Sequence, residues 1–211
     1  MPHLVLVGDS ILDNVAYTRG GPDVVSQVRG LLPPGWEATL LAVDGSTTDH
    51  VAAQIGRLPK QATHLVLSVG GNDALMRQRI LEAPVSSMAD SLEALADMAS
   101  DFERRYRLAI AACLGTALPL AVCTVYNGCF DNQSFQRLAS ATLTMFNDAI
   151  IRVAVEHALP VIDLRLVCLT AEDYANQIEP SSVGGAKIAR VIIGLVCGAD
   201  TVAPATRIVI G

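Results

Sequence analysis

The chain has 211 residues, of which 51% are hydrophobic, and this is enough apolar material to fill the core of one domain spanning residues 1–211. Only 17% of the residues are charged and the formal net charge is -6, so the chain lacks the basic surface that neutralises nucleic-acid phosphates. The composition therefore argues against nucleic acid as a partner.

Short, continuously apolar runs alternate along the chain with longer segments in which apolar residues recur at helical spacing. Runs that are apolar throughout are typical of parallel strands covered on both faces. Because crossovers between parallel strands are right-handed, this order predicts an α/β fold, a three-layer α/β/α sandwich around a sheet of about five parallel strands. In chain order the expected elements are strand 3–8 (HLVLVG), helix 22–32, strand 38–43 (ATLLAV), helix 49–58, strand 64–70 (HLVLSVG), helix 85–114, strand 119–126 (PLAVCTVY), helix 134–156, strand 159–164 (LPVIDL) and helix 183–196.

The last segment, residues 199–211, follows the final expected helix and ends in a strand-like RIVI. Two expectations for this tail stay open. It could add an edge strand to the sheet, or it could contact a second copy of the chain in a homo-oligomer.

Several sequence features bear on the cellular compartment. The first apolar run begins directly after His3, without a basic segment or a small-residue cleavage site, and no apolar stretch approaches the length of a membrane span. The five cysteines are odd in number and mostly lie in apolar runs, which favours buried thiols over disulfides. No histidine falls at metal-ligand spacing with them, so we expect no metal site. Together these patterns predict a cytoplasmic protein without a membrane span.

Polar residues follow three of the expected strands, at the sheet edge where parallel α/β proteins bind their ligands. Ser10 follows the first strand in GDS, Gly45 the second in DGS, and Asn72 the third in GGND. Singly, Ser10 and Asn72 could be helix caps and Gly45 a loop glycine. Together, the backbone N–H groups of Ser10 and Gly45 and the amide of Asn72 would form a three-donor oxyanion hole, which acyl transfer needs.

Three further residues are candidates for a substrate pocket. Asp9 lies beside Ser10 as a turn former or cap, and the loop 125–133 (VYNGCFDNQ) places Tyr126 and Asn127 after the fourth strand. The alternative for this loop is a plain connecting turn, which the Asn-Gly pair favours.

These motifs resemble those of the SGNH hydrolase superfamily, also called GDSL hydrolases, over nearly the whole chain. GDSILDN is similar to the first block of that family with Ser10 as the nucleophile, Gly45 matches the glycine of the second block, and GGND matches the third with Asn72 as oxyanion donor. The resemblance implies a flavodoxin-like three-layer fold and an enzyme without a cofactor. Its substrates would be small esters, thioesters or acyl groups on sugars or lipids.

The last block departs from the family pattern. The family normally has Asp-x-x-His-Pro there, which supplies the catalytic base and the carboxylate that orients it. Here the block reads NQIEPSSVGG, so Asn176 occupies the aspartate position and Glu179 the histidine position, ahead of Pro180. A serine hydroxyl is a weak nucleophile without a base, and losing the histidine of a serine triad can cost roughly a millionfold in turnover.

Two residues are candidates to replace that histidine. Glu179 precedes Pro180, which favours an extended backbone that would direct the carboxylate toward Ser10. An ordinary glutamate has a pKa of about 4.3, so the site would have to raise the pKa by desolvation, and the Asn176 amide can hydrogen-bond either protonation state. His50 lies early in the second expected helix and is the other candidate as base or support. Alternatively, Glu179 is an ordinary exposed acid.

We therefore expect a serine hydrolase of the SGNH type that forms an acyl-enzyme on Ser10 and uses Glu179 as a non-standard base. Two alternatives stay open. One is a catalytically degenerate binding protein that has kept the fold and the pocket, and the other is an acyltransferase that uses the same serine.

Overall fold

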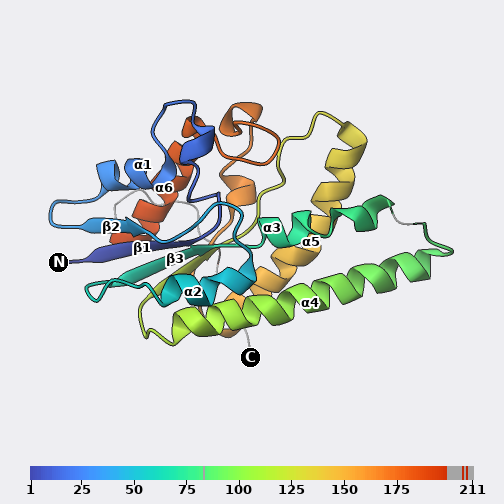
Figure 1. Cartoon of the computed structure of the whole chain (residues 1–211), viewed down its shortest axis with the longest axis horizontal. Coiled ribbons are helices and arrows are strands. Elements are labelled where there is room, and N and C mark those ends of the chain that lie inside the picture. The colour runs from blue at the N-terminus through green and yellow to red at the C-terminus, as the bar shows by residue number, and fades with distance from the viewer. Residues whose placement is uncertain (83, 199–205, 207, 209–211) are drawn as a thin grey trace.

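The computed structural model describes residues 1–82, 84–198, 206 and 208, and these residues are built around a five-stranded sheet (Figure 1). All neighbouring strands are parallel and the spatial order is β2-β1-β3-β4-β5. This is the flavodoxin-like order, and it confirms the predicted fold class. The strands are β1 (His3–Gly8), β2 (Glu37–Leu40), β3 (His64–Ser68), β4 (Leu120–Cys123) and β5 (Val161–Ile162).

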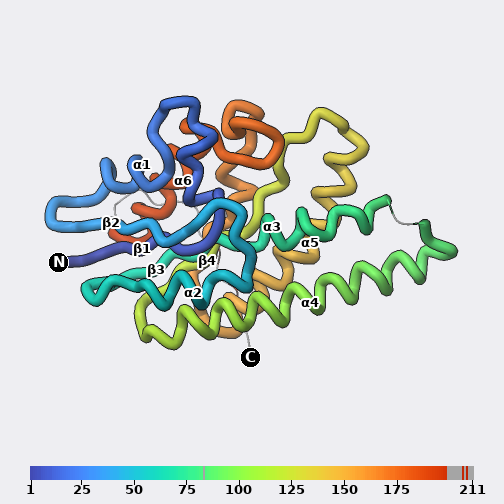
Figure 2. Tube along the Cα trace, in the orientation of Figure 1, coloured from blue at the N-terminus to red at the C-terminus, as the bar shows by residue number. Residues whose placement is uncertain are grey.

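Helices cover both faces of the sheet (Figure 2). On one face α1 (Val24–Leu31) packs against α6 (Ser182–Cys197), and on the other α4 (Met88–Leu114) packs against α5 (Gln133–Glu156) and α2 (Val51–Ile55). The remaining helical segments are α3 (Gly71–Leu75) and the 3-10 turns Val15–Tyr17, Thr48–His50, Gln78–Glu82, Leu164–Leu166 and Ala171–Asp173.

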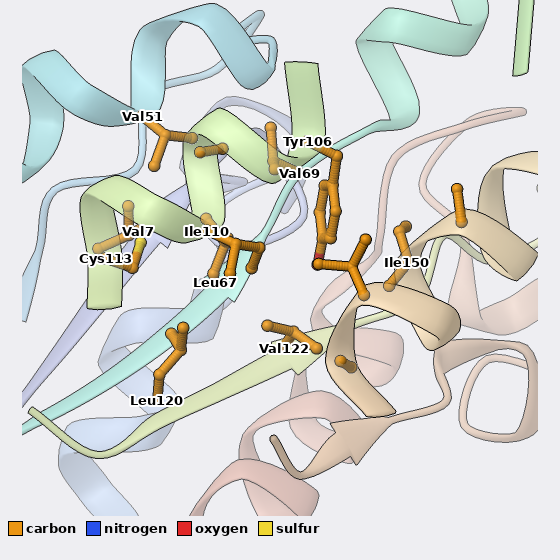
Figure 3. Packing of buried hydrophobic residues seen from close by; sticks show 14 of the residues in the cluster. Val7, Val51, Leu67, Val69, Tyr106, Ile110, Cys113, Leu120, Val122 and Ile150 are labelled. Atoms are coloured by element: carbon orange, nitrogen blue, oxygen red, sulfur yellow. The ribbon is translucent and has the colours of Figure 1, made fainter. Parts of the chain in front are cut away.

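Strand periodicity divides the core into two layers, because successive side chains of a strand point to opposite faces. In β1, Val5 and Val7 belong to the cluster beneath α4 and α5, whereas Leu4 and Leu6 belong to the cluster beneath α1 and α6. All four side chains are fully buried. Figure 3 shows the first of these clusters, in which Ile110 of α4 packs against the sheet. Burying each such side chain contributes roughly 1.5–3 kcal/mol, so β1 is firmly anchored.

The observed strands lie where the sequence predicts them, but most are shorter than predicted. The strand β1 spans the predicted residues, whereas β2, β3, β4 and β5 are all shorter than their apolar runs. The helix predicted over 49–58 begins as a 3-10 turn, Thr48–His50, because Thr47 and His50 form a reciprocal capping box there. The tail predicted over 199–211 lies outside the described residues apart from positions 206 and 208.

The helix α5 is the one segment among the described residues whose length and composition would suit a membrane span. A core helix passes the same test, and several of its side chains, among them Phe146, Ile150 and Val153, are fully buried in the cluster beneath α4 and α5. The helix therefore gives no firm indication of a membrane span.

Candidate active site

The loop after β1 presents Ser10 at the carboxyl end of the sheet. Gly8 has φ +130°, and a Cβ at this position would overlap the carbonyl oxygen of Ser68, so only glycine fits. The Asp9 N–H donates to that carbonyl oxygen at 3.0 Å, and the Asp9 side chain accepts from the Ile11 N–H at 3.2 Å. Asp9 therefore caps the turn. The Ser10 hydroxyl is left without a capping role among the described residues.

A buried glutamine joins the loop after β1 to the loop after β2. Gln54 of α2 is 2% exposed, and its side-chain amide both accepts from the Gly8 N–H and donates to the Gly8 carbonyl oxygen, each at 2.8 Å. The same amide donates to the Ser46 hydroxyl at 3.1 Å. Gln54 thus fixes the backbone next to Ser10. Gln54 was not among the predicted site residues. Its only signal in the sequence is that it is a polar residue in an otherwise apolar helix.

The loops after β2 and β3 are bound to each other near Ser10. The Asn72 side chain donates from Nδ2 to the Ser46 carbonyl oxygen at 2.9 Å, and Asp73 accepts from the Thr48 N–H and hydroxyl at 3.0 and 2.7 Å. Asn72 lines the same pocket as Ser10 and has a second amide N–H to offer. Gly45 lies in the exposed turn next to Ser46 with φ +78°.

The loop that precedes α6 carries Glu179 into the same pocket. Tyr174 and Pro180 form an antiparallel bridge, and the Ala175 N–H donates to the Glu179 carbonyl oxygen at 2.8 Å, so the segment folds back on itself. The Asn176 Oδ1 accepts from the N–H groups of Ile178 and Glu179, both at 2.9 Å. Asn176 therefore acts on Glu179 through its backbone.

The Glu179 carboxyl group is desolvated beside Ser10. Glu179 is 6% exposed, and its Oε2 has no hydrogen-bond partner among the described residues. Burial raises the pKa of Glu179 to about 7, and the negative charge of Asp44 adds to this rise, whereas hydrogen bonding from the Ser10 side chain opposes it. A carboxyl group with this pKa can accept a proton near neutral pH. Glu179 is therefore not an ordinary exposed acid.

The other predicted pocket residues are placed as follows. Asp9, Tyr126 and Asn127 all line the pocket that contains Ser10 and Glu179. Burial raises the pKa of Asp9 to about 8, despite the opposing hydrogen bond from the Ile11 N–H, so Asp9 is mainly protonated at neutral pH. The Tyr126 hydroxyl donates to the Ile178 carbonyl oxygen at 2.7 Å and thereby supports the loop that holds Glu179.

His50 lies in a different setting. It is exposed, it does not line the pocket, and its Nδ1 accepts from the Thr47 N–H at 2.9 Å as part of the capping box. Within residues 1–82, 84–198, 206 and 208 there is no group of three or more histidine, cysteine, aspartate or glutamate side chains placed to hold a metal ion.

Comparisons with known proteins bear on the family and on the fold. A family model described as the GDSL-like lipase/acylhydrolase family matches residues 6–184. None of the curated proteins is a significant match to the sequence.

Several solved structures share the fold. The lipase Lip_vut3 from a goat rumen metagenome is 18% identical with a TM-score of 0.70, over 93% of this chain and 98% of its own. An acetyl xylan esterase, AlAXEase, is 18% identical with a TM-score of 0.69, over 92% and 99%. An extracellular lipase from Streptomyces rimosus is 15% identical with a TM-score of 0.66, over 91% and 98%.

Proposed function

The chain belongs to the GDSL-like lipase/acylhydrolase family, the SGNH hydrolases, and on this basis we propose that it hydrolyses an ester or acyl group through an acyl-enzyme on Ser10. The observation that supports this proposal best is the desolvated Glu179 carboxyl group beside the Ser10 hydroxyl in one pocket. That pairing supplies a nucleophile and a base with a suitable pKa.

In the first half of the proposed reaction, the Ser10 Oγ attacks the substrate carbonyl carbon while Glu179 accepts the hydroxyl proton. The oxygen of the tetrahedral intermediate takes the negative charge. The Ser10 N–H and the free N–H of Asn72 stabilise that charge, and the Gly45 N–H is the third proposed donor. Collapse of the intermediate breaks the ester bond, and Glu179 returns the proton to the leaving alcohol.

In the second half, water attacks the acyl-enzyme while Glu179 accepts one of its protons. Collapse of this intermediate restores the Ser10 hydroxyl and releases the carboxylic acid. Glu179 thus replaces the usual histidine in both halves, and Asn176 holds its backbone in place of the usual aspartate. The usual aspartate stabilises the imidazolium that forms when a histidine base accepts a proton. A carboxylate base forms no imidazolium, so the replacement of both residues is chemically consistent.

Labelling with a fluorophosphonate probe tests this proposal, together with hydrolysis of p-nitrophenyl butyrate. We expect a covalent adduct on Ser10 in the parent, none in Ser10→Ala, and hydrolysis that Ser10→Ala abolishes. If the parent forms no adduct and its hydrolysis equals that of Ser10→Ala, the chain is a binding protein with this fold.

A further inference from the structure

The pocket that contains Ser10 is polar at one end and apolar along the rest of its length. Ser10, Asn72 and Glu179 form the polar end, and the pocket encloses about 790 Å³ including its open mouth. Apolar residues from α3, the turn Gln78–Glu82, α4 and α5 form most of the remaining wall, among them Ala74, Ile80, Met98, Phe135, Ala139 and Leu143.

The apolar wall continues into the hydrophobic core. Met98 of α4 belongs to the buried cluster beneath α4 and α5, and Ile80 and Leu143 pack against that cluster. Figure 2 shows residues 71–82 running alongside the amino-terminal half of α4, and the ion pair between Arg77 and Asp101 joins the two segments. The pocket therefore extends from the strand ends into the layer of α3, α4 and α5.

Two polar side chains along this wall, those of Arg77 and Tyr126, are already engaged within the protein. Among the described residues that line the pocket, Arg77 is the only cationic one, and its guanidinium pairs with Asp101 and donates to the Asp73 carbonyl oxygen at 3.0 Å. The Tyr126 hydroxyl is bound to the Ile178 carbonyl oxygen. The described part of the wall thus offers no free cation for an anionic substrate group. Gln78, Asn127 and Thr142 also line the pocket, but most of its lining residues are apolar. The wall is therefore better suited to an apolar chain than to a sugar ring, whose hydroxyl groups need several polar partners.

From these observations we propose that the preferred substrates are esters of medium-length apolar acyl chains, with the chain lying between α3, α4 and α5. The inference rests on the proposed function, because the acyl carbonyl must lie at Ser10 for the chain to enter this part of the pocket. Leu143 and Ala139 of α5 then determine acyl-chain length, since both side chains line the apolar part.

Hydrolysis of p-nitrophenyl acetate, butyrate and octanoate tests the proposal. Burying one methylene group increases kcat/KM by about fourfold, so we expect octanoate to be preferred over acetate by well over tenfold. The Leu143→Trp variant fills the pocket and should lower the octanoate-to-acetate ratio at least tenfold. Leu138→Trp is the matched control, because Leu138 lies on the same helix, is 50% exposed and does not line the pocket. If Leu143→Trp fails to fold, Ala139→Leu serves with the same readout.

Binding separates this inference from the proposed function. In the Ser10→Ala background, isothermal titration with methyl octanoate measures chain binding without turnover. We expect methyl octanoate to bind more tightly than methyl acetate, and Leu143→Trp or Ala139→Leu to weaken that binding. If the parent hydrolyses no ester but this binding pattern holds, the catalytic proposal fails and the chain pocket stands. A preference for acetate, together with octanoate binding that neither pocket variant changes, would overturn the inference.

Discussion

Asn14 donates from Nδ2 to the carbonyl oxygen of Pro180 at 3.0 Å, although the two residues are 166 positions apart in the sequence. Asn14 is fully buried, and its Oδ1 accepts from the Val24 N–H at 2.9 Å. Pro180 directly follows Glu179, and Asn14 lies in the segment that follows Ser10. This single side chain therefore connects the nucleophile loop with the loop that carries the proposed base.

Replacing Asn14 tests whether this connection matters for catalysis. Asn14→Asp keeps an acceptor for the Val24 N–H but removes the donor to Pro180, which leaves a buried carbonyl oxygen unpaired. We expect a loss of about 1–3 kcal/mol in the free energy of unfolding, measured by urea denaturation. We also expect kcat to fall at least tenfold with KM less affected, because Glu179 would no longer be held in place. An unchanged kcat in a folded Asn14→Asp variant would show that Asn14 only supports the fold.

Removing the Asn72 amide tests the oxyanion hole. Asn72→Ala eliminates one proposed donor, and we expect kcat to fall by about 10²–10³ with a small change in KM, because the donor acts mainly on the transition state. Steady-state kinetics with p-nitrophenyl butyrate measures both constants. Asn72 also donates to the Ser46 carbonyl oxygen, so a thermal melt should accompany the kinetics. A rise in KM with kcat unchanged would argue against the assignment.

The raised pKa of Glu179 predicts a pH-dependent cost to stability. Its pKa is about 7 in the folded chain and near 4.5 in the unfolded chain, so the folded state binds more protons between these values. Stability contributed by the protonated group is present below about pH 4.5 and is lost as the pH rises through 7. Glu179→Gln cannot ionise. We expect it to be more stable than the parent by on the order of 1–2 kcal/mol at pH 8, with a smaller difference at pH 5, measured by urea denaturation.

Asp9 gives a second and separate stability prediction. Burial raises its pKa to about 8, so the parent loses stability as the pH rises from about 4 through 8, by at most about 1.4 kcal/mol per pH unit. Asp9→Asn keeps an acceptor for the Ile11 N–H without the charge. We expect its stability relative to the parent to increase between pH 5 and pH 8, as measured by unfolding in urea. Parallel pH curves for the two proteins would contradict a protonated Asp9.

The sequence predicted the parts of the site that depend on short stretches of chain. Ser10 and Asn72 follow buried strands, and the parallel register, with Gly8 opposite Ser68, brings the ends of β1 and β3 together. The contacts of Gln54 and Asn14 could not be predicted in the same way. They join segments that are distant in sequence, and only the folded chain shows which backbone groups their amides meet.

The edge strand β2 illustrates a second limit. Its apolar run continues through Leu41, Ala42 and Val43, whose N–H groups still donate to carbonyl oxygens of β1, although the regular strand ends at Leu40. The role of Asn176 was also only partly predicted. Its side chain binds the backbone N–H of Glu179, whereas the sequence suggested contact with the carboxyl group.

The dependence of kcat/KM on pH tests the role of Glu179 most directly, with the parent, Glu179→Gln and His50→Ala assayed in parallel on p-nitrophenyl butyrate. The parent rate should rise with pH through an apparent pKa of about 7 as Glu179 ionises, and His50→Ala should give the same curve. In Glu179→Gln, kcat/KM should fall at least a hundredfold, and its rise with pH near 7 should disappear. An unchanged titration and rate in Glu179→Gln, or their loss only in His50→Ala, would contradict Glu179 as the base.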